Sequence, residues 1–282
     1  MVDARFFAPT LGCVILPNEV LLTYMPRSAQ KNASIRNRRK KSHFPYAIVA
    51  HHFAAHRGTY MNTWLKKNKG TILFFACFAI FRTAIADWNP VPTASMRPTI
   101  LEGDVVFVNR LAYNLKVPLT DIVLAKLADP VRGDIVTFSS PKDGTRLIKR
   151  IAALPGDTVE MRNGMLAING IPAQYTQHET VVEPLHQGMQ LHALRAQENV
   201  AGKQHIVQYM PEVNAKRDFG PFVVPQDQFF MLGDNRDNSE DSRFIGSVPR
   251  ELLIGRTGRL LVSADIKANW LPRFERFGQA LN

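Results

Sequence analysis

A continuous apolar run, followed by many short alternating runs, dominates the hydropathy pattern of this chain. Residues 72–81 carry only apolar side chains, Arg82 interrupts the run, and a less regular apolar stretch continues to Trp88. The span 71–88 is close to the minimum of about 17–20 residues that a helix needs to cross a bilayer. Arg82 can extend its guanidinium toward the membrane interface, and Trp88 suits that interface. We therefore expect residues 71–88 to form a transmembrane helix.

The residues on either side of this segment indicate its orientation. Three lysines lie within residues 61–70, so the positive-inside rule places that flank in the cytoplasm and exports everything after Trp88. Two alternatives stay open, a buried helix and a signal peptide cleaved at the small-x-small pattern of Ala84 and Ala86. We favour an uncleaved anchor.

From residue 100 onward the pattern changes to short runs with a period of two, separated by Gly, Asp and Asn. This pattern is typical of antiparallel strands, and Asn163-Gly164 suits the tip of a type I′ hairpin. The expected strands are 103–109, 132–138, 146–151, 158–162, 165–168, 226–232 and 253–262.

The strand pattern predicts a mainly β domain over residues 89–265. Residues 174–222 are polar with little periodicity, and we interpret them as an inserted, partly extended lobe. Residues 266–282 carry aromatic and basic side chains, and we expect either an interfacial amphipathic tail or a packed C-terminal helix.

The charge of the chain is concentrated before the apolar run. The chain of 282 residues has a net charge of +11, and residues 1–70 account for +10 of it. The remaining body is nearly neutral, which argues against binding of nucleic acid and for a basic flank beside a membrane. Residues 1–60 form a basic N-terminal extension, and an alternative is that translation begins at Met61. Both cysteines, Cys13 and Cys77, precede the β region, so that region has no disulfide.

A serine and a lysine stand out as candidate catalytic groups. Ser95 lies between Pro92 and Pro98, which prevent a helix and hold the backbone of the segment rigid. Such a backbone suits a positioned nucleophile, although an ordinary loop leaving the membrane has the same composition. Lys149 alternates with Leu147 and Ile151 on what should be the apolar face of a strand. Burial lowers the pKa of a lysine, and the neutral amine can then take a proton from a serine. The alternative is a solvated lysine on a strand that is basic throughout, with its neighbour Arg150 on a wet face.

Residues 233–243 form a dense run of acidic and amide side chains. The run lacks the pattern of an EF-hand calcium loop, because Arg236 occupies a would-be ligand position and Ser239 stands where glycine is required. We expect a rigid turn with internal Asp–Arg pairs instead, and we expect no metal ion and no cofactor.

Four segments together resemble the conserved boxes of the bacterial type I signal peptidases, or leader peptidases. They are Pro92–Thr99, Gly103–Asn109, Arg132–Asp157 and Gly233–Arg243, in the same order as in that family. The resemblance covers residues 71 to about 262. It implies that Ser95 is the nucleophile and Lys149 the general base.

The same resemblance implies roles for further residues. Thr93 and the Ser95 backbone N–H should form the oxyanion hole, and Ser239 should hold the lysine amine. Asp241 and Arg243 should form a supporting ion pair. Shallow apolar pockets for small substrate side chains should be lined by Val91, Met96, Ile100, Leu147 and Ile148.

The chain departs from the family pattern at a few positions. Many members carry Ser and Gly where this chain has Thr93 and Ala94, and an aromatic residue is common where Ile245 stands. Thr93 retains the hydroxyl group.

The resemblance implies a membrane-bound serine endopeptidase that removes N-terminal signal peptides from preproteins after an Ala-x-Ala-like site. Its partners should be signal peptides and the lipid bilayer, with no nucleic acid. The catalytic domain should lie on the periplasmic side of the inner membrane, behind a single membrane pass. Three alternatives are a pilus or conjugation maturation peptidase of the same superfamily, a repressor-type DNA-binding autoprotease and a catalytically dead membrane binding protein.

Overall fold

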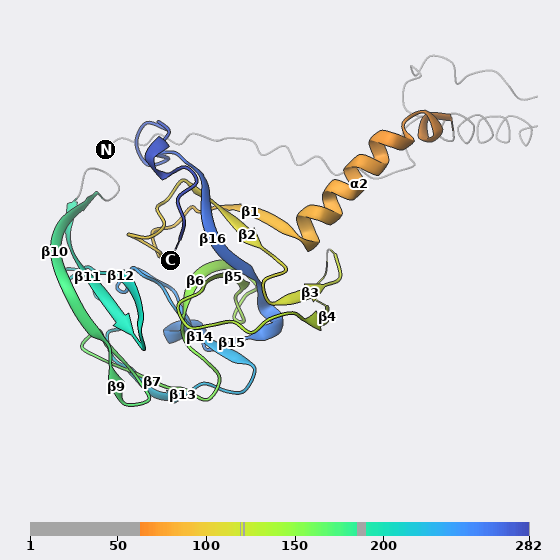
Figure 1. The fold of residues 1–282 in the computed structure, drawn as a ribbon. Helices are drawn as coiled ribbons and strands as arrows, with labels where there is room; N and C mark the ends of the chain where they lie inside the picture. Colours follow the sequence, from red (N-terminus) through yellow and green to blue (C-terminus); the bar gives the residue numbers. More distant parts are fainter. Residues whose placement is uncertain (1–62, 119, 121, 185–189, 282) are drawn as a thin grey trace, which may run out of the picture. The chain divides into compact units, whose positions relative to one another are not determined.

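A computed structural model describes residues 63–118, 120, 122–184 and 190–281 of the chain (Figure 1). The basic extension expected over residues 1–60 lies outside these residues. The described part consists of an apolar helix, α2, followed by a body made almost entirely of antiparallel strands. The expected mainly β class is confirmed.

Helix α2 spans Lys69–Ala84 and buries none of its side chains. It ends earlier than the expected segment 71–88, because Ala86–Pro90 form strand β1, which pairs with β2 (Asp104–Asn109). The C-terminal boundary of the expected helix was therefore wrong. The physical reason is Asp87, whose buried carboxylate forms ion pairs with arginines of other segments and draws residues 86–88 into the sheet. Within the described residues, no helix is both long enough and apolar enough to cross a membrane.

A seven-stranded sheet forms the centre of the body. Its strand order is β1-β2-β16-β5-β6-β14-β15, and every neighbouring pair is antiparallel. The remaining strands of the sheet are β5 (Ile135–Ser139), β6 (Arg146–Ala153), β14 (Gln228–Leu232), β15 (Val248–Pro249) and β16 (Leu253–Ser263). The five runs expected as strands over 103–109, 132–138, 146–151, 226–232 and 253–262 all contribute to this sheet.

A second sheet has the order β13-β7-β8-β9. Its strands are β13 (Phe219–Val223), β7 (Thr158–Arg162), β8 (Met165–Ile168) and β9 (Ile171–Pro172). The turn between β7 and β8 has φ of 50° at Asn163 and 81° at Gly164, as a type I′ turn requires. The expected hairpin is confirmed.

The lobe expected over residues 174–222 is more regular than its sequence suggested. Strands β10 (Gln174–Pro184), β11 (Gln190–Val200) and β12 (Lys203–Tyr209) form a three-stranded antiparallel sheet. Its strands bury both charged and apolar side chains, which hides the period of two in the sequence. A short hairpin of β3 (Asn114–Lys116) and β4 (Val123–Lys126) completes the set of sheets.

The C-terminal segment forms no α-helix among its described residues, so that alternative was wrong. It contains a 3-10 turn at Phe274–Arg276, here η3, and bonds back to β16 through the pairs Leu260 N–Gln279 O and Leu281 N–Gly258 O. Trp270 and Phe274 are each 71% exposed, so their rings face solvent instead of the core. Whether this tail lies at a membrane interface stays a prediction.

Candidate active site

The turn that carries Ser95 is held against the large sheet by apolar side chains. Residues 93–100 form bends and turns without a helix, as the two flanking prolines predict. Val91, Met96 and Ile100 are buried in one cluster with side chains of β2, β5 and β16, whereas Ser95 is half-buried. The buried apolar side chains thus fix the backbone around Ser95 on its inner side and leave its hydroxyl accessible.

Three consecutive residues of the 233–243 turn tie this segment in place. Asn235 donates from its backbone N to Ser95 O and from Nδ2 to Ala94 O, both at 3.1 Å. The Asp234 carboxylate accepts a 2.5 Å bond from Thr99 Oγ1. A Cβ on Gly233 would stand 2.5 Å from Ser95 O and closer still to Ser239 Oγ, so only glycine fits there.

Arg150 connects the same aspartate to strand β6. Its guanidinium forms two bonds with the Asp234 carboxylate, of 2.9 and 2.8 Å, and both groups are buried. Sequence reasoning placed Arg150 on a wet face and assigned no individual role to Asp234 or Asn235. All three residues lie inside the segments that resemble conserved boxes of the family, and this position could have drawn attention to them. Their pairing could not be predicted, because it depends on contacts between distant segments.

Lys149 lies in contact with the Ser95 hydroxyl. Its Nζ is 2.6 Å from Ser95 Oγ and 3.0 Å from the carbonyl oxygen of Ile148. Only 2% of Lys149 is exposed, so the alternative of a solvated lysine is wrong. Burial lowers the pKa of this amine to about 8, against the opposing attraction of Asp241, Asp234 and Glu240. A substantial fraction of the amine is therefore neutral near pH 8 and can accept a proton.

The end of the 233–243 turn contains the expected ion pair. Arg243 donates to both carboxylate oxygens of Asp241 at 2.8 Å, and both side chains are buried. Asp241 also accepts from the backbone N of Gly233 at 3.1 Å. Ser239 Oγ, in contrast, is buried and has no hydrogen-bond partner among the described residues. The expected bond from Ser239 to the lysine amine is therefore not formed here, since Lys149 Nζ donates to Ser95 and Ile148 instead.

The residues expected around the substrate divide into two groups. Val91, Met96 and Ile100 lie in the core beneath the Ser95 turn, because apolar side chains are needed there to anchor it. Leu147 and Ile148, on β6, are only half-buried. Thr93 is exposed, and its hydroxyl is free to turn toward a bound group.

One side of β6 is open next to these two residues. In the described part of the chain, β14 pairs only with residues 150–153 of β6, whereas β5 covers the opposite edge along 146–150. The backbone of residues 146–149 thus has one edge that no strand of the described chain occupies. An extended peptide can add to an edge of this kind.

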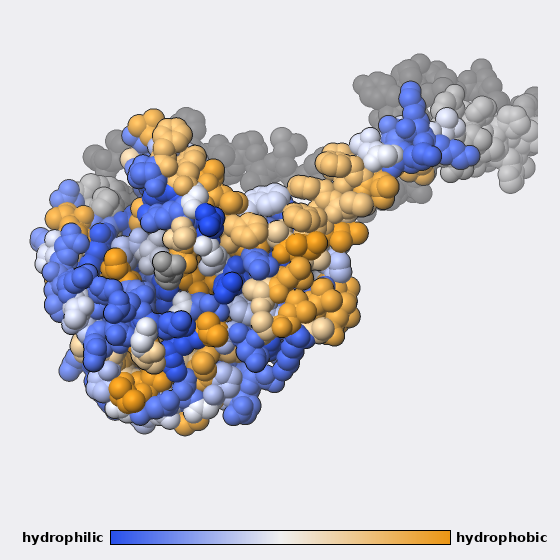
Figure 2. Space-filling model, in the orientation of Figure 1, coloured by the Kyte–Doolittle hydropathy of each residue, from blue (hydrophilic) through white to orange (hydrophobic). Residues whose placement is uncertain are grey.

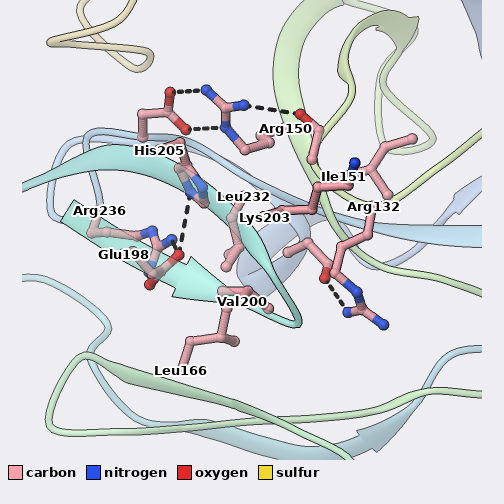
Figure 3. Close-up of a pocket in the computed structure, with 13 residues that line it drawn as sticks. Arg132, Arg150, Ile151, Leu166, Glu198, Val200, Lys203, His205, Leu232 and Arg236 are labelled. Carbon is pink, nitrogen blue, oxygen red and sulfur yellow. Dashed lines mark hydrogen bonds and ion pairs between the residues drawn. The ribbon is translucent and has the colours of Figure 1, made fainter. Parts of the chain in front are cut away.

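The lobe supports the 233–243 turn through a buried ion network. Glu198 on β11 accepts from both terminal nitrogens of Arg236, and His205 Nε2 lies 3.2 Å from the same carboxylate (Figure 3). The Arg236 guanidinium and nearby His205 hold the pKa of Glu198 below its usual range despite the cost of burial. The space enclosed by these side chains is about 10 Å³, room for no more than about one water molecule. The network is therefore a structural support with no space for a substrate.

No group of three or more His, Cys, Asp or Glu side chains in the described ranges is arranged to hold a metal ion. A serine hydroxyl beside a buried lysine amine, on an antiparallel β scaffold, is typical of serine hydrolases that use lysine as the base.

Comparison with known proteins gives the family of the chain. The family described as "Signal peptidase, peptidase S26" matches residues 62–261. The protein named signal peptidase I from Pseudomonas fluorescens is 34% identical over 217 residues, which cover 71% of this chain and 73% of that protein. The signal peptidase I of Buchnera aphidicola subsp. Schizaphis graminum is 30% identical over 249 residues, covering 73% of this chain and 78% of that protein. A crystal structure of a signal peptidase I from Enterococcus faecalis V583 is 28% identical and covers 46% of this chain and 98% of that chain, with a TM-score of 0.28. The chain belongs to the signal peptidase family, peptidase S26.

Proposed function

We propose that this protein is a membrane-anchored signal peptidase I that cleaves exported preproteins after an Ala-x-Ala-like site, with Ser95 and Lys149 as its catalytic residues. The observation that carries the proposal is the 2.6 Å contact between Ser95 Oγ and Lys149 Nζ, in which the amine is buried and its pKa is lowered. The family assignment supports the peptidase and argues against a DNA-binding repressor.

The reaction proceeds through an acyl-enzyme. Ser95 Oγ attacks the scissile carbonyl carbon while its proton moves to Lys149 Nζ. The resulting ammonium then gives that proton to the leaving amine as the C–N bond breaks. Once the new N-terminus has left, Lys149 takes a proton from water, and the hydroxide formed attacks the ester. As the ester C–O bond breaks, the Lys149 ammonium returns this proton to Ser95 Oγ and the signal peptide is released. No step requires a metal ion or a cofactor.

Two donors are available for the oxyanion of the tetrahedral intermediate. The Ser95 backbone N–H donates to no acceptor among the described residues, and the exposed Thr93 hydroxyl is two residues away in the same turn. Donors of this kind typically contribute about 3–4 kcal/mol each to the transition state. Ser239 should accept a bond from the Lys149 ammonium when that group is charged. Asp241 and Arg243 hold the turn that carries Ser239.

The substrate should bind in an extended conformation along the open edge of β6. Backbone bonds to residues 146–149 would bring the scissile carbonyl to Ser95, because Lys149 on the same strand already contacts that hydroxyl. Ile148, which packs against the layer of Val91, Met96 and Ile100, and Leu147, on the opposite face of β6, would then each contact substrate side chains. Small side chains fit such shallow contacts best, which accounts for the expected preference for alanine.

Signal peptidases I are typically membrane-anchored, and we propose the same for this protein. Helix α2 exposes a continuous apolar surface over residues 72–81, and the basic flank 61–70 lies at its N-terminal end. We infer a single pass that includes α2, with the β body on the extracytoplasmic side. A periplasmic reporter enzyme fused after Pro90 should be active, and activity only of a cytoplasmic reporter at this point would reverse the orientation.

The decisive test is cleavage of a model preprotein by the purified full chain in detergent, with the cut mapped by mass spectrometry. The wild type should cut after Ala-x-Ala, whereas Ser95→Ala and Lys149→Met should each lose at least about a thousandfold in rate. Lys203→Met replaces an exposed lysine of β12 and should retain full activity. Substantial turnover by either of the first two variants would refute the proposed roles. A pilin-type precursor without an Ala-x-Ala site, if cut preferentially, would favour the maturation-peptidase alternative.

A further inference from the structure

One buried carboxylate of the lobe over residues 174–222 reaches the turn that carries the nucleophile. Figure 2 shows that hydrophilic residues predominate on the visible surface over β10–β12, as expected for strands that face solvent. Glu183, near the C-terminal end of β10, differs from such surface residues because only 5% of it is exposed. A buried carboxylate is costly unless it is paired, so the partners of Glu183 indicate why it lies there.

Both oxygens of the Glu183 carboxylate are paired with arginines. Oε1 accepts from Nη2 of Arg195 on β11 at 2.6 Å, which is a contact within the lobe. Oε2 accepts from Nη1 of Arg97, which lies 86 residues earlier in the chain. Arg97 is the second residue after Ser95, and the side chains of Arg97 and Glu183 are both largely buried. A buried ion pair therefore joins the lobe to the turn that carries the nucleophile.

Arg97 is itself tightly held within that turn. Its backbone N donates to Ala94 O at 3.0 Å, and this bond closes the turn around Ser95. Its side-chain Nε donates to Oε2 of the buried Glu102 at 2.7 Å. A planar guanidinium that is held by two carboxylates from different segments is fixed in orientation as well as neutralised. Because the backbone of the same residue closes the turn, a displacement of Arg97 would displace Ser95.

A second series of bonds connects the lobe to the same turn. Arg195 Nε donates to the side-chain oxygen of Gln208 on β12 at 3.0 Å, and Gln208 is fully buried. The backbone N of Gln208 donates to Asp234 O at 2.8 Å, and the Asp234 carboxylate accepts from Thr99. The bonds thus form a ring that leaves the turn at Arg97, crosses all three strands of the lobe and returns to the turn at Thr99.

We propose that Glu183 is a positioning residue for the nucleophile, which holds Arg97 and thereby keeps the Ser95 hydroxyl and backbone N–H in place for the reaction. The inference rests on the proposed function, because it gives the lobe a role in the reaction of Ser95. The ring contains no residue of the open β6 edge over 146–149, where the substrate should bind. Loss of Glu183 should therefore lower kcat and leave KM nearly unchanged.

The test is cleavage of a model preprotein by the purified full chain in detergent, with kcat and KM measured separately. Glu183→Gln keeps the shape of the side chain and removes its charge. It should lower kcat at least about tenfold and change KM less than about twofold, since a shift of about 1 Å in a reacting group can cost about a hundredfold. Glu183→Asp keeps a carboxylate and should recover part of the rate. The control Glu179→Gln removes a glutamate from an exposed position of the same strand and should leave both constants unchanged.

A double-mutant comparison tests whether Glu183 acts through Arg97. In an Arg97→Gln background, Glu183→Gln should cost less than about twofold in kcat, because the contact that it removes is already absent. Thermal unfolding checks that each variant is folded at the assay temperature, and Glu183→Asp takes the place of Glu183→Gln in both backgrounds if the latter is not. An unchanged kcat, an effect confined to KM, or an equal loss in both backgrounds would overturn the inference.

Hydrogen exchange provides a measurement that does not depend on catalysis. The backbone N–H groups of Arg97 and Ile100 both donate within the Ser95 turn, to Ala94 O and Met96 O. Their exchange should be faster in Glu183→Gln than in the wild type and unchanged in Glu179→Gln. Unaltered exchange in Glu183→Gln would refute this inference even in an active peptidase, whereas faster exchange in a chain that does not cleave preproteins would refute only the proposed function.

Discussion

Replacement of Lys149 by methionine should abolish cleavage and, at neutral pH, stabilise the protein. Lys149→Met keeps an unbranched side chain of similar length but removes the amine from a site that is only 2% exposed. Burial makes the charged form of this amine costly, and the pKa of Lys149 is lowered as a result. The protein keeps the amine despite this cost. If the amine is retained for catalysis at the expense of stability, its removal should abolish activity and raise the free energy of unfolding.

The magnitude follows from the pKa of this one group. Its pKa is 10.5 in the unfolded chain and about 8 in the folded protein. Between these values the unfolded chain holds more protons, so the free energy of unfolding of the wild type rises with pH. The penalty for the buried charge is about 3 kcal/mol at pH 7 and less than about 1 kcal/mol at pH 10. The lost bonds to Ser95 and Ile148 cost about 1 kcal/mol each at any pH. Lys149→Met should therefore gain about 1 kcal/mol at pH 7 and lose about 1 kcal/mol at pH 10.

The assay is urea unfolding of both proteins in the same neutral detergent at pH 7, 8, 9 and 10. Because other titrating groups are common to the two proteins, their difference isolates Lys149. The control Lys203→Met removes an exposed lysine and should shift the free energy of unfolding by less than about 0.5 kcal/mol. In the wild type, kcat/KM should rise with pH up to about 8, since the free enzyme needs the neutral amine.

A difference between Lys149→Met and the wild type that stays constant from pH 7 to pH 10 would show that the amine is not destabilised by burial. The proposed general base would then lack its physical basis. The same conclusion would follow if kcat/KM in the wild type were flat over that range.

Three further predictions concern the turn that holds the site. Ser239→Ala removes a hydroxyl that has no partner among the described residues, so the urea midpoint should change little. If that hydroxyl binds the charged amine during turnover, kcat should fall at least tenfold. An unaltered kcat would contradict that role. Gly233→Ala introduces a Cβ that collides with Ser95 O and Ser239 Oγ. It should lower the free energy of unfolding by at least about 2 kcal/mol and remove most of the activity. A crystal structure of the variant with the turn unmoved would contradict this. Glu198→Gln leaves Arg236 buried without its counter-ion and should destabilise the protein by about 3–5 kcal/mol, measured by urea unfolding; a loss below 1 kcal/mol would show that the network is not a support.

Much of the fold follows from local sequence patterns. The period of two in 103–109 and 146–151, and Asn163-Gly164 at a hairpin tip, depend on neighbours within a few residues. The strands of the lobe over 174–222 could not be predicted in this way, because they bury Glu183, Glu198 and Gln208. These polar residues interrupt the alternation of apolar and polar positions along the strands. Two of the partners that make such burial tolerable, Arg97 for Glu183 and Arg236 for Glu198, come from segments 38 or more residues away.

The sequence by itself determined the class of the protein and the order of its strands along the chain, because residue types and spacing are local properties, and its resemblance to the signal peptidases indicated the pair Ser95 and Lys149. Only the tertiary structure decided that the helix ends before Asp87, that Arg150 pairs with Asp234 and that Asn235 holds the Ser95 turn. These features depend on charged and amide groups that become buried only when distant segments meet. The cost of burying each group is offset by a partner that no local pattern identifies.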